Sequence, residues 1–466
     1  MYDLVIIGAG PGGYVTAIRA AQLGMNVALI EKGTVGGTCL NRGCIPTKAL
    51  LHAGEVLSKA REGAKFGLLC GNPSYSAEGV SAYRNDTVKR LRTGTEALLK
   101  SNNVTLLRGT ATFVDPHNIS IESADGERQT ISGKNIIIAT GSTVNEPNIP
   151  GIHLAKTSDD ILEKDFDIPQ SVAVAGASII GVEFAEMFNA FGKDVTIIAT
   201  RDRLLPKNDK DLGIQLGLLF KKKGISICYH CRMKSIEKTE DGKLKVWFST
   251  PDGDDSLVAD MIVSCVGRKA NLENLKPENA GVRVKNGAIA VNADLRTNIK
   301  NIYAIGDCTG GDNQLAHVAS AQGIYVVEKL ARHKPSVNLK IIPTCVYTSP
   351  EAASVGMTED ECDAAGIEIE TGKFLMSANG KSVVVGLDRG FVKTVFEKKS
   401  GRILGAQLLC DRATDIVAEL GVAIANGLKK EQILKFIHPH PTIAESVAES
   451  VDDSEAMAIH LMKKIR

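Results

Sequence analysis

Two cysteines five positions apart, Cys39 and Cys44, lie in the segment GGTCLNRGC, which continues directly into IPTK. Residues five apart in a regular α-helix have Cα atoms about 8.7 Å apart, whereas a disulfide requires roughly 4.4–6.8 Å. A bond between the two sulfurs would therefore require an irregular segment, which Gly43 makes easier. Pro46 suits the first turn of a helix, so Cys44 is expected beside the positive end of a helix, which favours its thiolate.

This pair has three interpretations: a redox-active couple, a metal site or two unrelated thiols. A metal ion needs more than two ligands, and the neighbouring residues supply none, so no metal site is predicted. The pair is predicted to be redox-active, because a stabilised thiolate is a good leaving group from a disulfide and a good electron donor. The second close pair, Cys228 and Cys231, lies in a segment that reads as a strand and is interpreted as structural.

The overall composition is that of an ordinary globular protein. The chain has 466 residues, 44% of them apolar, and a formal net charge of +1. This length predicts about two to four domains, and the charge gives no reason to expect nucleic acid or an acidic membrane as a partner. No stretch reaches the roughly 18 consecutive apolar residues of a membrane span. The first residues, MYDLVIIGAG, read as a strand and a turn rather than a targeting peptide.

The number of cysteines indicates the compartment in which the protein is found. Ten cysteines are too few for a disulfide scaffold in a chain of this length. We therefore expect a cytoplasmic protein, and in that reducing compartment a close cysteine pair is more often catalytic or metal-binding than structural.

A dinucleotide-binding pattern precedes the cysteine pair. An apolar strand at 4–7 leads into the turn GAGPGG, then into a helical run to Gly24, and a second strand at 27–30 ends at Glu31. The glycines Gly8, Gly10 and Gly13 allow a tight turn and a close approach to a pyrophosphate at the helix N-terminus. Glu31 stands where an acid accepts from a ribose hydroxyl. The sequence therefore predicts a first nucleotide-binding fold.

The same pattern recurs later in the chain. A strand at 172–175 leads to Gly176, Ser178 and Gly181, a helix follows to Gly192, and a further strand occupies 195–198. Two doubly wound folds in one chain predict two bound nucleotides.

The second copy departs from the first at two positions. Ser178 replaces the middle glycine, and Ala199 stands at the position equivalent to Glu31, so the ribose acid is missing. Arg201 and Arg203 follow, and arginines in place of the carboxylate are what a 2′-phosphate would require. The alternative is a solvated basic loop on a fold that binds NAD, and the residues leave NAD and NADP both open.

Other strands are predicted around these units. Apolar segments at 135–140 and 260–266 end in Gly141 and Gly267, and NIYAIGD ends in Asp307. An acid just beyond a strand end lies where ligands bind in open α/β sheets, although such an acid also commonly caps a helix. From about Ile341 alternating segments indicate antiparallel strands, with helices near 413–427 and 444–463, so an α+β C-terminal domain is expected.

Together these motifs resemble the dihydrolipoyl dehydrogenases of the pyridine nucleotide–disulfide oxidoreductase family. The resemblance covers nearly the whole chain and is carried by GAGPGG, GGTCLNRGCIPTKALL, ATGS, GASIIGVE, CVGRKAN, NIYAIGD, LAH, HPHPTIAE and AIH. It implies an α/β fold with two doubly wound, Rossmann-like domains and an α+β dimerisation domain. The implied boundaries are an FAD-binding domain at 1–150, an NAD(P)-binding domain at 151–269, a central domain completing the FAD site at 270–340 and a dimerisation (interface) domain at 341–466.

The resemblance also implies roles for individual residues. Glu31 would hold the FAD adenosine ribose and Asp307 the ribityl side, while Lys48 would lie near the flavin N5 and pair with Glu183. The residues implied at FAD are Gly8, Gly10, Gly13, Glu31, Lys32, Thr38, Lys48, Ala111, Thr140, Gly141, Asp307, Leu315, Ala316 and His317. Those implied at NAD(P) are Gly176, Ser178, Gly181, Glu183, Arg201, Arg203 and Gly267.

By the same resemblance the catalytic residues are Cys39, Cys44, His440 and Glu445. Cys44 would face the flavin as the charge-transfer thiol, and Cys39 would meet the substrate. His440, oriented by Glu445, would act as acid and base from the other subunit of a homodimer. From the residues alone, histidine suits proton exchange with thiols near neutrality, but His438 competes with His440 and both could be plain turn residues.

The implied reaction is oxidation of protein-bound dihydrolipoamide by a Cys39–Cys44 disulfide, with FAD and NAD or NADP as cofactors. The implied partner is the lipoyl-carrying protein of a 2-oxoacid dehydrogenase or glycine cleavage system. One alternative is an NADPH-dependent reductase of another low-molecular-weight disulfide, similar to glutathione reductase, which would explain Ala199 and Arg201 better. Another is a flavoprotein subunit with a binding or structural role, which the intact cysteines and His440 disfavour.

Overall fold

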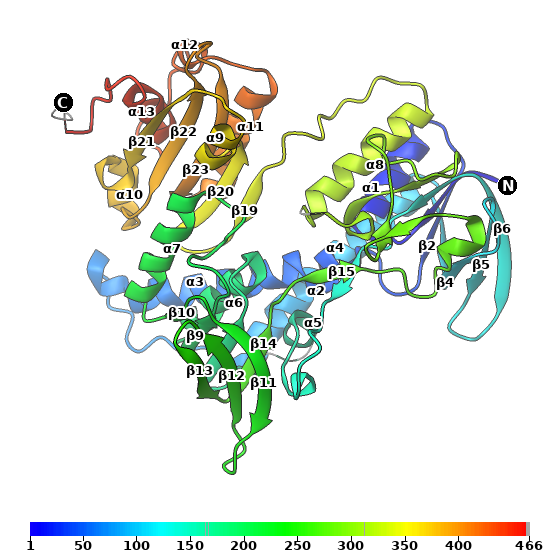
Figure 1. Cartoon of the computed structure of the whole chain (residues 1–466), viewed down its shortest axis with the longest axis horizontal. Helices are drawn as coiled ribbons and strands as arrows, with labels where there is room; N and C mark the ends of the chain where they lie inside the picture. The colour runs from blue at the N-terminus through cyan, green and yellow to red at the C-terminus, as the bar shows by residue number, and fades with distance from the viewer. Residues whose placement is uncertain (164, 166, 312, 463–466) are drawn as a thin grey trace.

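The computed structural model describes residues 1–163, 165, 167–311 and 313–462. Its strands form three main sheets, and Figure 1 shows the first sheet at the N-terminal side, the second at the bottom and the third near the C-terminus. None of the helices in this described part combines the length and apolar character needed to cross a bilayer.

The first sheet has a parallel centre built on β1. The order is β3-β2-β1-β6-β5-β4, and β18 pairs with β6 on the parallel side. Residues 4–7 of β1 are all buried, as expected for a parallel strand covered on both faces. The strands are β1 (Tyr2–Ile7), β2 (Val27–Glu31), β3 (Thr105–Arg108), β4 (Thr110–Phe113), β5 (Asn118–Glu122), β6 (Arg128–Ile138) and β18 (Ile302–Ala304).

Helices bring the chemistry to this sheet. Figure 1 shows α8 beside α1, and a Cβ on Gly323 of α8 would come within 1.7 Å of the Thr16 hydroxyl of α1, so only glycine permits this approach. The helices that follow the first sheet's strands are α1 (Pro11–Gln22), α2 (Gly37–Arg42), α3 (Cys44–Arg61), α4 (Ala77–Ser101) and α8 (Ala316–Leu330).

The second sheet is the predicted repeat of the first. Its order β10-β9-β8-β14 is parallel throughout, and a separate antiparallel sheet of β11, β12 and β13 follows. The elements are α5 (Ser158–Glu163), β8 (Ser171–Ala175), α6 (Ile179–Ala190), β9 (Asp194–Ile198), α7 (Lys210–Lys222), β10 (Ser226–Cys228), β11 (Arg232–Lys238), β12 (Leu244–Thr250), β13 (Gly253–Ala259) and β14 (Met261–Ser264). Short strands β7 (Ser142–Val144) and β15 (Arg268–Ala270) pair with each other, and β16 (Val284–Lys285) pairs with β17 (Ala288–Ile289).

The third sheet is antiparallel, in the order β19-β20-β23-β22-β21. Its strands are β19 (Thr344–Val346), β20 (Glu351–Gly356), β21 (Ile369–Leu375), β22 (Phe391–Glu397) and β23 (Ile403–Cys410). Its helices are α9 (Glu359–Ala364), α10 (Gly380–Val385), α11 (Ala413–Ala425), α12 (Lys430–Ile433) and α13 (Glu445–Asp453). The predicted α/β fold with an α+β C-terminal part is confirmed.

One predicted helix is much shorter than expected. The pattern at 444–463 predicts a helix, but α13 ends at Asp453, and Ala456 adopts a left-handed conformation with φ of 59°. The chain then turns back, so that the backbone N–H groups of Ile459 and His460 donate to the Glu449 side chain of α13. This side-chain anchor takes the place of further helical hydrogen bonds. Residue 463, the last of the predicted helix, lies outside the described residues.

Candidate active site

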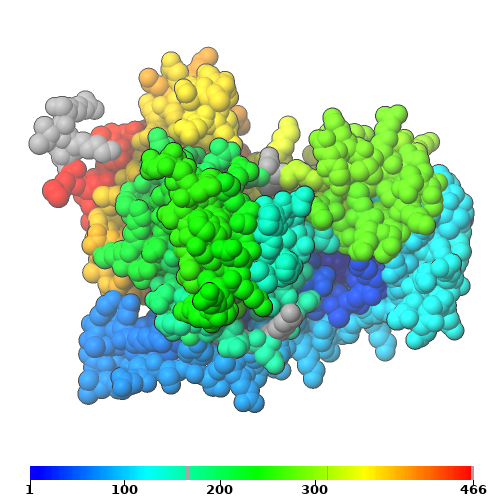
Figure 2. Space-filling view, turned by 60° about the horizontal axis from the view of Figure 1, so that its bottom comes forward, coloured from blue at the N-terminus to red at the C-terminus, as the bar shows by residue number. Residues whose placement is uncertain are grey.

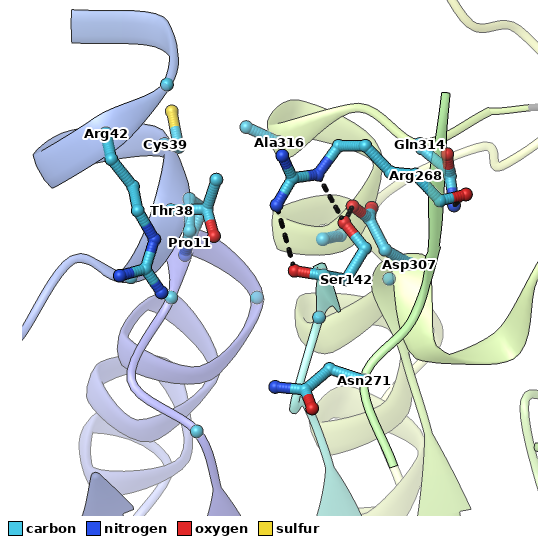
Figure 3. A pocket seen from close by; sticks show the side chains of 18 of the residues that line it. Pro11, Thr38, Cys39, Arg42, Ser142, Arg268, Asn271, Asp307, Gln314 and Ala316 are labelled. Atoms are coloured by element: carbon cyan, nitrogen blue, oxygen red, sulfur yellow. Dashed lines mark hydrogen bonds between the residues drawn. The ribbon is translucent and has the colours of Figure 1, made fainter. Parts of the chain in front are cut away.

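A cavity of about 540 Å³ lies between the first sheet and the helices α5 and α6 of the second nucleotide fold. Figure 2 shows a hollow on this face between teal-green atoms and the yellow-green atoms near residue 300, with dark blue N-terminal residues at its bottom. Its walls come from the glycine turn after β1, from α2 and α3, from the start of α6, and from β19 with the residue that follows it. Figure 3 shows Cys39 and Arg42 on one side of this pocket and Arg268, Ser142 and Asp307 on the other.

The two predicted redox cysteines meet at this cavity. Cys39 lies in α2 and Cys44 is the first residue of α3, and both are free thiols that line the wall. Gly43 separates the helices with φ of −145° and ψ of −111°, which is the irregular break that the spacing requires. A Cβ on Gly43 would lie 2.9 Å from the Thr38 carbonyl oxygen, so the break also favours glycine.

The two sulfurs differ in acidity. A hydrogen bond from the Cys39 thiol lowers the pKa of Cys44 to about 7, with help from the Lys48 cation and against the opposing effect of burial. Donation to Cys44, together with burial, raises the pKa of Cys39 far above its usual range. Cys44 is therefore the thiolate of the pair near neutrality and Cys39 the proton-bearing partner.

An ion pair joins the two nucleotide folds beside Cys44. The Lys48 ammonium of α3 donates to both Glu183 carboxylate oxygens of α6 at 2.9 and 2.8 Å, and the Tyr347 backbone N–H donates to Glu183 at 3.1 Å. Burial lowers the pKa of Lys48, but the Glu183 carboxylate raises it, and the net shift is upward. The Lys48–Glu183 pairing that the resemblance implies is present, and it keeps a positive charge beside the Cys44 sulfur.

The wall of the cavity suits a dinucleotide that carries ribose hydroxyls and a pyrophosphate. Glu31 ends β2 and accepts hydrogen bonds from the backbone N–H groups of Ala9 and Gly33, each at 2.7 Å, and its oxygens keep lone pairs for a ribose. Gly8 has φ of +103°, and a Cβ there would lie 2.4 Å from the Ala139 carbonyl oxygen. A Cβ on Gly13 would lie 1.7 Å from the Gly8 carbonyl oxygen, so this glycine lets α1 pack against β1.

The residues predicted for FAD are brought together with one exception. Gly13 does not line the cavity but lies beneath the turn. The predicted residues that do line it are Gly8, Gly10, Glu31, Lys32, Thr38, Lys48, Ala111, Thr140, Gly141, Asp307, Leu315, Ala316 and His317. These residues fit FAD.

The polar lining residues that were not predicted as site residues include Ser142, Arg268, Asn271 and Gln314. The Arg268 guanidinium donates to the Ser142 hydroxyl at 2.9 Å, and that hydroxyl donates to Asp307 at 2.6 Å (Figure 3). The motif CVGRKAN contains both Arg268 and Asn271, and it was the available signal.

Of the residues predicted for NAD(P), only Glu183 lines this cavity. The others lie in the second glycine turn and the start of α6, in the loop after β9 and just beyond β14. A Cβ on Gly181 would lie 2.0 Å from the Gly176 carbonyl oxygen, the same close approach as in the first fold. Ser178 and Gly267 are exposed at this end of the second sheet.

The two arginines in the loop after β9 differ in exposure. Ala199 is fully buried, with its N–H and C=O bonded to the backbones of Cys228 and Cys231. Arg201 is exposed, whereas the Arg203 side chain is 21% exposed and contacts Asp202 and the Pro206 carbonyl. The polar contacts of Arg203 lie within its own loop, and its aliphatic stem lies close to Gly213 of α7. Arg201 is therefore the more exposed of the two arginines.

The second cysteine pair is only partly on a strand. Cys228 ends β10, whereas Cys231 follows a turn through His230, which has φ of 56°. Burial raises the pKa of both thiols. Among the described residues no three histidine, cysteine or acidic side chains form a metal-binding group.

The predicted catalytic histidine, His440, lies outside the cavity that holds the two cysteines. His440 Nδ1 and Glu445 Oε1 are 2.8 Å apart, and the Thr442 backbone N–H donates to the other Glu445 oxygen at 2.8 Å. Burial raises the pKa of Glu445, but these hydrogen bonds outweigh it and the net shift is downward. Neither His440 nor Glu445 lines the cavity, so one chain does not bring the histidine to the cysteines.

The structure separates the two competing histidines. The His438 side chain is 5% exposed and its Nε2 lies 3.0 Å from Glu419. The His440 side chain is 79% exposed. Of the two, His440 presents its ring to a substrate or a second subunit.

Known proteins match this chain over nearly its whole length. The sequence profile described as pyridine nucleotide-disulphide oxidoreductase matches residues 2–323, and the dimerisation domain of the same family matches residues 342–451. The dihydrolipoyl dehydrogenase of Bacillus subtilis (strain 168) is 38% identical, over 98% of this chain and 99% of the relative. That of Geobacillus stearothermophilus is 37% identical, over 99% and 98%.

A solved structure has the same fold. The HOCl-induced flavoprotein disulfide reductase RclA from Escherichia coli superposes with a TM-score of 0.85 at 29% identity, covering 97% of this chain and 99% of that one.

Proposed function

Because the chain belongs to the pyridine nucleotide-disulphide oxidoreductase family, we propose that it is a dihydrolipoyl dehydrogenase. The observation that carries the proposal is the pair of thiols of unequal acidity, Cys39 and Cys44, at the wall of a cavity shared by two nucleotide folds. The relatives named dihydrolipoyl dehydrogenase, aligned over nearly the whole chain, support the substrate.

The cofactors follow from the family and the wall residues. FAD would occupy the cavity, with its adenosine ribose at Glu31 and its ribityl chain at Asp307. When bound, it would take an electron pair from the reduced cysteines and pass hydride to the nicotinamide. We propose an FAD-binding domain at 1–150, an NAD(P)-binding domain at 151–269, a central domain at 270–340 and an interface domain at 341–466.

The chain's own residues would carry the thiol chemistry. His440 takes a proton from the first substrate thiol, and the resulting thiolate attacks Cys39 Sγ of the oxidised pair. The Cys39–Cys44 bond breaks, and its electron pair leaves on Cys44, whose low pKa makes it the better leaving group. The second substrate thiol then displaces Cys39, gives its proton to the departing Cys39 sulfur, whose raised pKa favours the thiol form, and closes the lipoyl disulfide. The products of this half-reaction are lipoyl and the reduced cysteines.

A homodimer would complete each site. His440 and Glu445 lie away from the cavity of their own chain, and the segment that carries them matches the dimerisation domain of the family. We propose that His440 of one subunit faces Cys39 of the other. The physiological substrate would be the lipoyl-carrying protein of a 2-oxoacid dehydrogenase or glycine cleavage system, in the cytoplasm.

The electron acceptor is NAD or NADP, and the loop after β9 decides between them. Ala199 provides no carboxylate for a ribose, and Arg201 is exposed beside it, which supports NADP. Steady-state turnover with NAD⁺ and NADP⁺ in parallel tests this point. A preference for NAD⁺ of about tenfold or more, equal to about 1.4 kcal/mol, would refute the role of Arg201.

A second candidate function is NADPH-driven reduction of another low-molecular-weight disulfide. The missing acid at Ala199 favours it, and the structurally similar RclA is described as a disulfide reductase. Turnover of dihydrolipoamide and glutathione disulfide by the same preparation separates the two candidates. A protein that purifies without a flavin spectrum, or a Cys39→Ser variant that oxidises dihydrolipoamide at the wild-type rate, would exclude both.

A further inference from the structure

Two glutamates of helix α13 each pair with a histidine that lies outside the helix. Glu445 and Glu449 lie four residues apart, which places them one turn apart on the same face of the helix. His440 Nδ1 lies 2.8 Å from Glu445, and His460 Nδ1 lies 2.6 Å from Glu449. In both pairs Nδ1 faces the carboxylate, so Nε2 is the nitrogen left for other partners. The mechanism above uses only the first pair.

Backbone hydrogen bonds also hold the glutamate of the second pair. The Glu449 side chain is 13% exposed, and its second oxygen accepts from the backbone N–H groups of Ile459 and His460 at 3.1 and 3.2 Å. The chain reaches it only by turning back after Asp453. The His460 side chain is nonetheless 67% exposed, so its ring is anchored on one edge and open on the other.

The two pairs are electrostatically connected. The charge of His460 contributes to lowering the pKa of Glu445, after the effects of burial, Thr442 and His440. Farther along α13, burial together with Glu449 and Glu455 raises the pKa of Asp452. The two carboxylates linked to His460 by these interactions, Glu449 and Glu445, therefore lie on the same face of α13.

The proposed reaction leaves one proton to be removed. Two substrate thiols lose two electrons and two protons, and the hydride that reaches the nicotinamide takes both electrons and one proton. The remaining proton goes to water. His440, which accepts a substrate proton, must release it before the next turnover, and in the proposed dimer its ring would be covered by the other subunit.

We propose that His460, oriented by Glu449, takes this proton from His440 and passes it to solvent. The proposal rests on the proposed dihydrolipoyl dehydrogenase function. The transfer breaks the N–H bond of His440 and makes one on His460, and release then breaks that N–H bond and makes a bond from the proton to bulk water or a buffer base. His460 touches no substrate and acts through His440.

The test compares two variants of His460 in the full-length holoenzyme. Asparagine can keep a donor near the Nδ1 position and so preserve the anchor to Glu449, but it cannot carry a proton. We expect both His460→Asn and His460→Ala to lower kcat for dihydrolipoamide oxidation about tenfold, less than the ~10²–10⁴ of a direct acid–base group. Imidazole buffer should restore the rate of both, and the KM for the pyridine nucleotide should not change.

Two controls isolate the proton step. Reduction of ferricyanide by NAD(P)H needs no substrate thiol, so its rate should be unchanged in both variants. His52 is an exposed histidine of α3, and its Nδ1 lies 3.4 Å from the Glu55 carboxylate of the same helix. The kcat and the buffer dependence of His52→Gln should equal those of the wild-type protein.

Wild-type kcat in His460→Asn, with a loss only in His460→Ala, would overturn the proposal and leave the pair as an anchor for the chain end. A loss in His460→Asn that imidazole does not restore would overturn it as well. Absence of dihydrolipoamide turnover in the wild-type protein would instead refute the proposed function, and the proton carrier with it.

Discussion

At the scale of single residues, the site depends on a few charges and hydrogen bonds that give two cysteines different pKa values. Cys39 and Cys44 are both thiols at one wall of one cavity, yet their proton affinities shift in opposite directions. The asymmetry comes from the direction of the hydrogen bond between them and from the Lys48 cation near Cys44, whose effect Glu183 partly opposes. A substrate thiolate therefore meets one sulfur while the other leaves.

The pKa of Cys44 predicts a pH profile for alkylation. Its value of about 7 lies below the usual thiol value, so the thiolate predominates above that pH and is lost as pH falls through it. In the reduced protein, iodoacetamide labelling of Cys44, followed by mass spectrometry, should show a midpoint near pH 7. Lys48→Met should move the midpoint upward. A midpoint near the ordinary thiol value in wild type would contradict the prediction.

At the scale of elements, the site depends on glycines that let helices approach strands. Gly13 in α1 and Gly181 in α6 occupy equivalent places, each facing the carbonyl oxygen of the first glycine of its turn. The close approach brings the helix N-terminus to the cavity, where its N–H groups can bind phosphate. In both turns a glycine therefore allows the same close contact between helix and strand.

Gly13→Ala should damage the flavin site. The added Cβ would lie 1.7 Å from the Gly8 carbonyl oxygen, so α1 must move away from β1, at a cost of about 1–3 kcal/mol for overpacking. The measurement is flavin content after purification, together with unfolding by denaturant. Gly94→Ala is the matched control, because nothing lies within 4 Å of that Cβ in α4. It should stabilise the protein by about 0.5–1 kcal/mol and leave flavin content unchanged.

At the scale of the whole molecule, buried charges tie the second nucleotide fold to the C-terminal sheet. The Lys393 ammonium of β22 donates to both oxygens of Asp209, the N-cap of α7, at 2.9 and 2.8 Å, and the two side chains are 3% and 4% exposed. Burial lowers the pKa of Lys393, but Asp209 raises it and the net shift is upward. This contact fixes the third sheet relative to the cavity.

Lys393→Met should destabilise the protein strongly. It leaves Asp209 buried without its cation, which costs about 3–5 kcal/mol in apparent free energy of unfolding. Lys373→Met removes the more exposed partner of Asp211, whose ammonium lies 2.8 Å away, and should change stability by less than about 1 kcal/mol. Denaturant unfolding of both variants makes the comparison. Equal losses would show that burial of the Lys393 pair is not what matters.

A mixed dimer tests whether the site is shared between subunits. Cys39→Ser and His440→Gln homodimers should each fail to oxidise dihydrolipoamide. A heterodimer of the two, purified through different tags, should recover about half the wild-type turnover per dimer, because one of its two sites combines an intact Cys39 with an intact His440. If His440 served its own chain, the heterodimer would remain inactive.

Local chemistry was readable from the sequence alone. The glycine turns, the strand that ends at Glu31 and the break at Gly43 depend on steric limits of a few neighbouring residues, and the structure confirms each of them. The fold class followed from the repeat of one such unit and from the resemblance along the chain.

Only the tertiary structure decided which distant groups meet. Glu183 reaches Lys48 across 135 positions and Arg268 reaches Ser142 across 126, and no local pattern sets those distances. The helix predicted to run to residue 463 ends at Asp453, because Glu449 binds the returning chain in place of another helical turn. Residue type and spacing determine the local structure and the chemistry that a segment can have. Long-range packing determines which distant groups lie beside that segment.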